Sequence, residues 1–255
     1  MPELTIGNCT LFYQISSHAS PDTLPIVYVH GAGGSSHLWH NQVQTQMPGC
    51  AQTALDLPGH ARSGGSGEDS VEAYGRWVVS FMQELGYQQY VLAGHSMGGA
   101  ISMAVALTKP DLLRAIILVG TGARLRVTRE VLDRARKGAS FTEYAYAPDT
   151  PLSIQEEAEK EFSLTSPEVR YNDFLACDGF DSMQRVPEIS PPALIICGEQ
   201  DQLTPVKYSQ YLHRHIPNSR LEIIPQAGHM VMWEQAEACN RVIKDFMAKL
   251  TFNSP

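Results

Sequence analysis

The chain alternates short apolar runs with longer segments in which apolar residues occupy one face. The longer segments span residues 70–85, 97–108, 205–215 and 233–250, and their spacing of apolar positions predicts helices. The short runs are rich in β-branched residues and predict strands at 4–7, 10–15, 26–31, 52–57, 90–96, 115–122, 193–201 and 221–229. Such alternation is typical of a sheet covered by helices on both faces.

The short runs differ in their expected burial. The last five are apolar almost throughout, which indicates strands with helices packed on both sheet faces. The first two are close together in the chain and predict a hairpin at one edge of the sheet. The expected fold class is therefore α/β, with a mostly parallel, doubly wound sheet of eight strands.

One long segment interrupts the alternation. Residues 124–190 contain no strand-like run, but they carry charged helical stretches, scattered aromatic residues and prolines that mark turns. We interpret this segment as a helical insertion between two core strands. The core then comprises residues 1–123 and 191–255.

Composition and charge narrow the classes of function. Among 255 residues the chain has 19 Lys or Arg and 27 Asp or Glu, a net charge of −8. The basic residues form no stripe, so a nucleic-acid partner is not expected. No apolar run reaches the roughly 18 residues that cross a bilayer, and the N-terminus does not resemble a signal peptide. Five scattered cysteines suit a reducing compartment, so we expect a cytoplasmic protein without a membrane partner.

A glycine-rich turn, residues 31–36, follows the third strand-like run. It is one residue short of the G-x-G-x-x-G loop that binds a dinucleotide, and Asp56 lies roughly 20 residues further on, as that loop expects. The same turn could instead supply a backbone N–H to an oxyanion in an acyl-transfer enzyme. A dinucleotide loop would have glycine where this chain has Ser36.

The pattern with the most chemical content is Gly94-His95-Ser96-Met97-Gly98, between an apolar strand and an apolar helix. This is the context of a nucleophile elbow, a tight turn that holds a serine in strained backbone geometry at the end of a strand. Side chains larger than glycine at 94 and 98 would collide with the neighbouring strand and helix. Ser96 is therefore the predicted nucleophile.

A serine nucleophile needs a base, and the base needs an acid that orients it. In this class the order along the chain is serine, acid, histidine. His229 follows the last strand-like run and is the predicted base, whereas His213 and His215 lie on a polar helical stretch. Asp201 ends the preceding run and is favoured as the acid, with Glu199 as the alternative.

Four blocks occur in order: HGAGG at 30–34, DLPGHARSGG at 56–65, GHSMGG at 94–99, and GEQDQLTP with AGHMVMWEQ at 198–205 and 227–235. With these blocks the chain resembles the α/β-hydrolase superfamily, in its lid-bearing group of esterases, lactonases and carbon–carbon hydrolases. The resemblance implies an α/β-hydrolase fold with a helical cap at 124–190, inserted after the sixth strand. The family usually has a glycine where this chain has Ala61.

The resemblance also implies roles for individual residues. The catalytic triad would be Ser96, Asp201 and His229, and the oxyanion hole would be formed by the backbone N–H groups of Ala32 and Met97. The glycine-rich turn then belongs to an acyl-transfer site instead of a cofactor site. Neither a cofactor nor a metal is expected.

Three further residues near that turn receive structural roles. The resemblance implies that His30 braces the glycine-rich loop. Asp56 becomes part of a fold marker with a tight turn after a strand, and Arg62 is expected to face a buried carboxylate.

The substrate pocket is expected to be apolar. No arginine stands out as a clamp for a substrate carboxylate, with Arg124 and Arg126 as weak candidates. We therefore predict hydrolysis of small, hydrophobic carboxylic esters through an acyl-enzyme. Lactonase, thioesterase and carbon–carbon hydrolase remain alternatives, as does a ligand receptor that keeps the triad. The candidate pocket residues are Phe141, Tyr144, Tyr146, Phe162, Phe174 and Met230.

Overall fold

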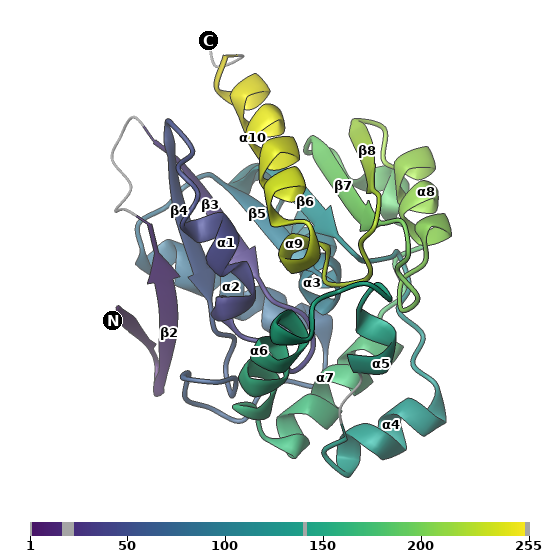
Figure 1. Cartoon of the computed structure of the whole chain (residues 1–255). Coiled ribbons are helices and arrows are strands. Elements are labelled where there is room, and N and C mark those ends of the chain that lie inside the picture. Colours follow the sequence, from purple (N-terminus) through teal and green to yellow (C-terminus); the bar gives the residue numbers. More distant parts are fainter. Residues whose placement is uncertain (1, 17–22, 140–141, 253–255) are drawn as a thin grey trace.

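An eight-stranded sheet forms the centre of the computed structural model, which describes residues 2–16, 23–139 and 142–252 (Figure 1). The strand order is β1-β2-β4-β3-β5-β6-β7-β8. β1 and β2 form the predicted hairpin, β2 is antiparallel to β4, and the remaining pairs are parallel. The bounds are β1 (Glu3–Ile6), β2 (Cys9–Ile15), β3 (Leu24–Val29), β4 (Cys50–Leu55), β5 (Tyr90–His95), β6 (Leu113–Val119), β7 (Ala193–Gly198) and β8 (Ser219–Ile224).

Helices cover both faces of the sheet, as predicted (Figure 1). Their bounds are α1 (His40–Val43), α2 (Val71–Glu84), α3 (Met97–Thr108), α4 (Arg129–Arg136), α5 (Thr142–Ala145), α6 (Leu152–Ser163), α7 (Pro167–Gly179), α8 (Val206–His215), α9 (Val231–Glu234) and α10 (Ala236–Phe252). Short 3-10 turns occupy Ser36–Trp39, Pro110–Leu112 and Val186–Glu188.

Each central strand contributes to two separate cores. On β3, Ile26 and Tyr28 belong to the core that residues of α1, α9 and α10 complete, whereas Val27 and Val29 belong to the core with α2 and α3. Successive side chains of a strand point to opposite faces, so a strand covered on both faces must be apolar throughout. This packing makes a rigid support for the end of β5, where Ser96 follows.

Three details differ from the sequence-based expectations. Among the described residues, β8 is an edge strand that pairs only with β7, and its residues before Ile224 are only partly buried although α8 and α10 contact it. The helix expected at 233–250 is divided into α9 and α10 at Gln235. The chain at 36–43, for which we predicted no element, forms short helical turns that place Trp39 in a fully buried position.

The helices α4 to α7 follow β6 and precede β7, where a helical insertion was predicted. They lie together at the carboxyl ends of the parallel strands (Figure 1). An isolated antiparallel bridge between Arg124 and Asp181 joins the two ends of the insertion. The insertion therefore returns to the core close to where it leaves it.

In the described part of the chain, no helix has the length and apolar character needed to cross a membrane. The five cysteines are all free thiols. Burial raises the pKa of Cys239 to about 12, so this thiol stays protonated near neutral pH and is a poor nucleophile.

Candidate active site

Ser96 lies in the tight turn between β5 and α3. Its backbone has φ 54° and ψ −115°, a strained conformation for a residue with a side chain. A Cβ at Gly94 would overlap the backbone of Gly98, and a Cβ at Gly98 would overlap the carbonyl oxygen of Val29 on β3. These contacts are the predicted steric reason for both glycines, and they allow the turn to present the serine at the strand end.

His229 and Asp201 form a close, buried pair. His229 Nδ1 lies 2.9 Å from Asp201 Oδ2. The backbone N–H groups of Leu203 and Thr204 donate to Asp201 Oδ1, and the Thr204 hydroxyl donates to Oδ2 at 2.8 Å. Burial alone would raise the pKa of Asp201, but His229 and these hydrogen bonds hold that pKa well below its usual value. A carboxylate of this kind fixes the imidazole so that Nε2 is the nitrogen that can accept a proton.

The alternative candidates lie elsewhere. Glu199 is exposed, although it is only two residues from Asp201. His213 is exposed and hydrogen-bonded to Ser219, and His215 stacks on Tyr211 at 4.0 Å between ring centroids. None of the three approaches Ser96, since none lines the cavity that Ser96 and His229 share.

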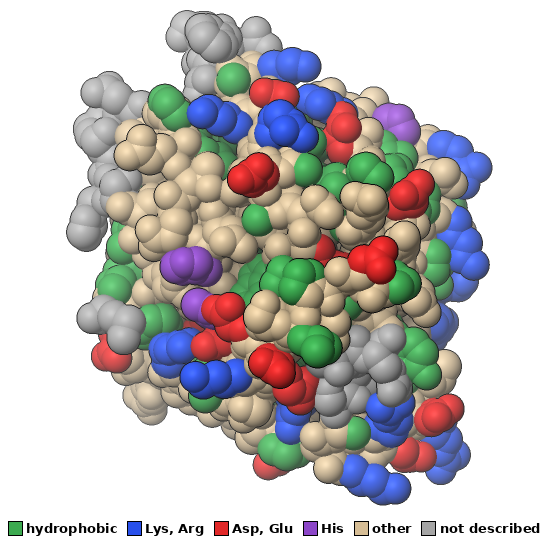
Figure 2. Space-filling model, viewed as in Figure 1, with side chains coloured by type: hydrophobic (Ala, Val, Ile, Leu, Met, Phe, Trp, Pro, Cys, Tyr) green, Lys and Arg blue, Asp and Glu red, His purple; other side chains and the backbone are tan. Residues whose placement is uncertain are grey.

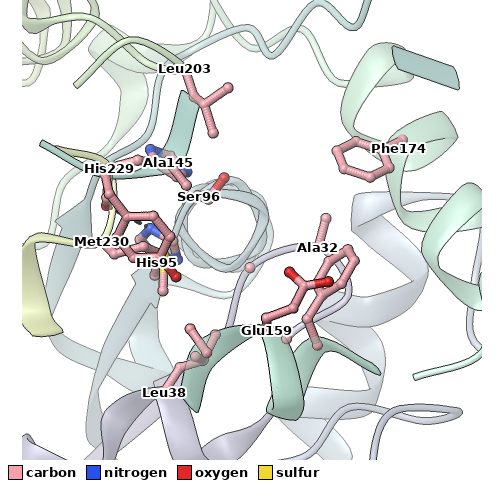
Figure 3. A pocket seen from close by; sticks show the side chains of 15 residues that line it. Ala32, Leu38, His95, Ser96, Ala145, Glu159, Phe174, Leu203, His229 and Met230 are labelled. Atoms are coloured by element: carbon pink, nitrogen blue, oxygen red, sulfur yellow. Dashed lines mark hydrogen bonds between the residues drawn. The ribbon is translucent and has the colours of Figure 1, made fainter. Parts of the chain in front are cut away.

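Ser96 and His229 face one cavity from two different strand ends (Figure 3). Within the described residues, the Ser96 hydroxyl makes no hydrogen bond, so the serine–histidine hydrogen bond is not formed in this structure. Such contacts are often long in a free enzyme and shorten in its substrate complex. The arrangement has the order and the components of an acyl-transfer site.

His95, next to Ser96, is a site residue that the sequence reasoning did not single out. Its Nε2 donates to the carbonyl oxygen of His229 at 3.0 Å. Burial, followed by the proximity of His229, lowers the pKa of His95 to about 3. This neutral side chain therefore fixes the backbone of the predicted base.

The glycine-rich loop approaches the same serine. A Cβ on Gly31 would lie 3.1 Å from Ser96 Cβ, closer than side chains normally pack, so only glycine fits without a shift. The carbonyl oxygen of Gly31 accepts from Gly34 N at 3.0 Å and from His30 Nδ1 at 2.8 Å. His30 Nε2 in turn accepts from Leu57 N at 3.1 Å. These bonds agree with the expected bracing role of His30.

The two expected oxyanion donors belong to the residue that follows Ser96 and to the glycine-rich loop. Met97 begins α3, and its side chain is fully buried, whereas Ala32 is half-buried at the cavity. Among the described residues, neither N–H group donates a hydrogen bond. Both are therefore available to a substrate oxygen.

The Asp56 carboxylate makes its hydrogen bonds to other residues of the protein. It is fully buried and accepts from the N–H groups of Ser36 and Arg62. The Arg62 guanidinium lies 3.8 Å from Asp56, as the expectation of a buried carboxylate partner required. Burial raises the pKa of Asp56, which these bonds only partly offset. The geometry leaves no room for Asp56 to bind a ribose.

The cavity at Ser96 has a volume of about 120 Å³. Of the predicted pocket residues, Tyr146, Phe162, Phe174 and Met230 line it. Tyr144 does not line it and is 46% exposed, because its side chain is turned to solvent. Phe141 is outside the described residues. Lining residues that the sequence reasoning missed are Leu38, Ala145, Ala158, Glu159 and Leu203.

Charged side chains are distributed unevenly around this cavity. Glu159 lines it, and no arginine or lysine of the described residues does. Arg124 and Arg126 line a different cavity, together with Lys207 and Arg214, so they are not placed to bind a substrate at Ser96. On the face that Figure 2 shows, acidic and basic side chains are interspersed. The described residues contain no group of three or more His, Cys, Asp or Glu that could hold a metal ion.

Known proteins match this chain over nearly its whole length. It is 31% identical to the solved structure of a thermophilic esterase, with a TM-score of 0.80, 98% of this chain covered and 97% of the other. It is 25% identical to a pimeloyl-acyl-carrier-protein methyl ester esterase of Neisseria meningitidis, over 89% of this chain and 95% of that protein. It is also 25% identical to a 2-hydroxy-6-oxo-6-phenylhexa-2,4-dienoate hydrolase of Burkholderia cepacia, over 88% and 87%.

The family model described as "Alpha/beta hydrolase family" matches residues 26–242. This range contains the elbow at Ser96, the glycine-rich loop, the helical insertion, Asp201 and His229. The chain therefore belongs to the alpha/beta hydrolase family.

Proposed function

We propose that this protein is a serine hydrolase that cleaves small, uncharged carboxylic esters through an acyl-enzyme. The observation that carries the proposal is the buried Asp201–His229 pair, 2.9 Å apart, beside the same cavity as a strained Ser96. An inert serine that merely begins a helix would need neither the strain nor the histidine. The roles of Ser96, Asp201 and His229 follow from this arrangement.

In the first step, Ser96 Oγ attacks the ester carbonyl carbon while His229 Nε2 takes the hydroxyl proton. Asp201 stabilises the resulting imidazolium. The carbonyl oxygen becomes an oxyanion, which the N–H groups of Ala32 and Met97 would bind. Collapse of this intermediate expels the alcohol with the proton from His229, and water then releases the acid by the same sequence of proton transfers.

The insertion would act as a cap over this site, so that residues 124–190 form a lid on a core of residues 1–123 and 191–255. Support comes from the cavity wall, to which α5, α6 and α7 contribute Ala145, Glu159 and Phe174. The carbonyl oxygen of Ala145 also accepts from the backbone N–H of His229 at 2.9 Å. A cap that touches the base in this way would couple substrate enclosure to catalysis.

The size and charge of the cavity support a small, uncharged substrate. A cavity of about 120 Å³ is of the order of those that hold a single benzene-sized group. Glu159, which interacts electrostatically with Arg170, is the acidic residue among the described residues that line it, and a carboxylate in this position disfavours substrates with a free carboxylate. A dienoate, the substrate named for the Burkholderia relative, carries such a carboxylate. An ester, the kind of substrate named for the Neisseria relative, need not carry a free carboxylate.

The experiment is a side-by-side panel of p-nitrophenyl acetate and butyrate, a thioester, a lactone and a dienone acid, with kcat/KM as the readout. We expect the esters to be the best substrates and Ser96→Ala to lose about 10⁴- to 10⁶-fold in kcat. Unchanged turnover in purified Ser96→Ala protein would refute the proposal. A single turnover that ends in a stable adduct would instead favour a ligand receptor.

A further inference from the structure

A second buried carboxylate, Asp173, contacts the glycine-rich loop. Asp173 is on α7 and is fully buried. Its Oδ2 accepts from the backbone N–H of Gly33 at 2.7 Å and from His60 Nε2 at 2.8 Å, and its Oδ1 accepts from the Tyr74 hydroxyl at 2.6 Å. This carboxylate of the helical insertion therefore holds a peptide group of the loop beside Ser96.

The geometry around His60 indicates a buried ion pair. Its Nε2 faces the Asp173 carboxylate, and its Nδ1 lies 3.1 Å from the carbonyl oxygen of Pro58. Both partners are acceptors, so both nitrogens donate and the ring is an imidazolium. Burial alone would lower the pKa of His60, but the Asp173 carboxylate, together with the Pro58 carbonyl and Asp56, outweighs burial and the pKa is raised. Asp173 is thus a charged acceptor with a charged partner.

A second acid of the insertion holds the other end of the loop. Glu161 on α6 accepts from the Ser35 hydroxyl at 2.7 Å, and its carboxylate also faces the Arg62 guanidinium. Gly33 has φ +67°, and the ring of Phe162 occupies the space that a Cβ on Gly33 would need. The insertion therefore fixes the loop by two carboxylates and one aromatic ring.

The position of Gly33 in the loop determines which peptide group the hydrogen bond to Asp173 orients. A peptide group is planar, so Gly31 O and the Ala32 N–H are parts of one plane, and Ala32 O and the Gly33 N–H are parts of the next. The core braces the first plane through His30 and Gly34, which both donate to Gly31 O. Asp173 braces the second plane. The two planes meet at Ala32, whose N–H is the expected oxyanion donor.

We propose that Asp173, charged and held by His60, is a positioning residue for catalysis, which acts through Gly33 to aim the Ala32 N–H at the oxyanion. This inference rests on the proposed serine hydrolase function. Asp173 does not touch the substrate. The effect of Asp173 appears in the first step of the reaction. There Ser96 Oγ adds to the carbonyl carbon and the Ser96 proton passes to His229. The carbonyl oxygen becomes the oxyanion, which accepts a hydrogen bond from the Ala32 N–H.

The test compares Asp173→Asn with Asp178→Asn, a matched control on the same helix. Asp178 accepts from the N–H of Val127 at 3.1 Å, within the insertion and away from the loop. Loss of a whole oxyanion donor costs about 10²- to 10³-fold in kcat, so a misaimed donor should cost about 10- to 100-fold. We expect this loss of kcat on p-nitrophenyl butyrate in Asp173→Asn, with KM within about threefold. Asp178→Asn should match the wild type.

A second readout separates positioning from general loosening. A trifluoromethyl ketone adds to the serine as an oxyanion, so its inhibition constant should rise in Asp173→Asn by the same factor as kcat falls. The matching methyl ketone lacks the fluorines that favour addition of the serine, so it forms little oxyanion and should bind equally to both proteins. A wild-type kcat, or a loss confined to KM, would overturn the inference.

Should Asp173→Asn fail to fold, Tyr74→Phe provides the same test, because it keeps the ring and removes only the hydroxyl, which donates to Asp173 and accepts from the N–H of Glu68. It should lower kcat several-fold at constant KM, and a folded Tyr74→Phe protein with wild-type kcat would overturn the inference. Failure of the proposed function is a separate result. It would appear as equal hydrolysis by the wild type and Ser96→Ala, whatever the Asp173 variants do.

Discussion

Two buried histidine–aspartate pairs in this molecule differ in the use of the second imidazole nitrogen. His229 Nδ1 lies 2.9 Å from Asp201, and within the described residues Nε2 has no partner. His60 uses Nε2 for Asp173 at 2.8 Å and Nδ1 for the carbonyl oxygen of Pro58. A histidine with one nitrogen available can pass a proton to and from a bound substrate, whereas one with both nitrogens bonded inside the protein is suited to holding its neighbours. The same two residue types therefore suit chemistry in one place and support in the other.

The same substitution in the two pairs should separate these roles most strongly. Asp201→Asn should lower kcat by about 10⁴-fold, because an amide favours the wrong tautomer of the histidine. Its amide oxygen can still accept from Leu203 and Thr204, so the loss of stability should be modest. Asp173→Asn should instead destabilise by about 3 kcal/mol, because it leaves the buried His60 cation without a counter-ion.

Steady-state kinetics and thermal unfolding of both variants check this reversal. A loss of about 3 kcal/mol corresponds to a decrease in Tm of about 6–12 °C for a chain of this size. Asp178→Asn is the control for a change of charge on α7. The comparison fails if Asp201→Asn lowers Tm more than Asp173→Asn does.

The pH dependence of stability gives a second test of the difference between the two pairs. The pKa of His60 is raised in the folded protein, so its contribution to stability is complete below the unfolded value and is lost as pH rises through the folded value. The groups that face His60 are Asp173, Tyr74, His30 and Asp56. We expect Tm of the wild type to fall as pH rises above 6.5, the ordinary pKa of the side chain, and through the raised pKa of the folded state.

The measurement is calorimetry at constant ionic strength, with His60→Gln as the reference. Glutamine can still donate to Asp173 but cannot titrate, so its Tm should change less over the same range. An equal fall in the two proteins would mean that His60 is not the group responsible.

A smaller effect concerns the charge that lines the cavity. Glu159→Gln should raise kcat/KM for the monomethyl ester of a dicarboxylic acid by about three- to tenfold, since it removes repulsion of roughly 1 kcal/mol. For p-nitrophenyl butyrate, which is uncharged, kcat/KM should stay within about twofold. Equal changes for both substrates would show that Glu159 acts on the shape of the cavity and not on its charge.

The smallest expected effect is on the length of the acyl group. Phe174→Ala should enlarge the cavity and raise the ratio of kcat/KM for octanoate over butyrate esters by about three- to fivefold. This is less than an enclosed methylene contributes, because Phe174 is only half-buried. A falling ratio would show that Phe174 does not limit the acyl site.

The elements of the core and the elbow could be predicted because their signals are local. A continuously apolar run identifies a buried strand, and Gly94 and Gly98 mark the turn around Ser96 within a few residues. Asp201 and His229 follow strand-like runs, so their approach to Ser96 follows from the parallel sheet. β8 has an apolar run too, and its edge position cannot be read from that run.

The supports of the glycine-rich loop could not be predicted in the same way. Asp173 resembles any acid on a helix, and its partners His60 and Gly33 are 113 and 140 residues away in the chain. The contacts depend on how α7 docks, which no short pattern encodes. Ala61 is a related case, since its φ of 43° explains why the family usually has glycine there.

The long separation between Gly33 and Asp173 also has a consequence for the order of synthesis. At about 5–20 residues per second, the ribosome makes Asp173 roughly 7 to 28 s after Gly33. During that time the nascent chain already contains the strand and helix around Ser96, but the buried N–H of the loop has no acceptor. The proposed oxyanion side of the site is completed only when α7 leaves the ribosome, and the proposed acid Asp201 and base His229 follow later in the chain, so a nascent chain would acquire hydrolytic activity only after His229 is made.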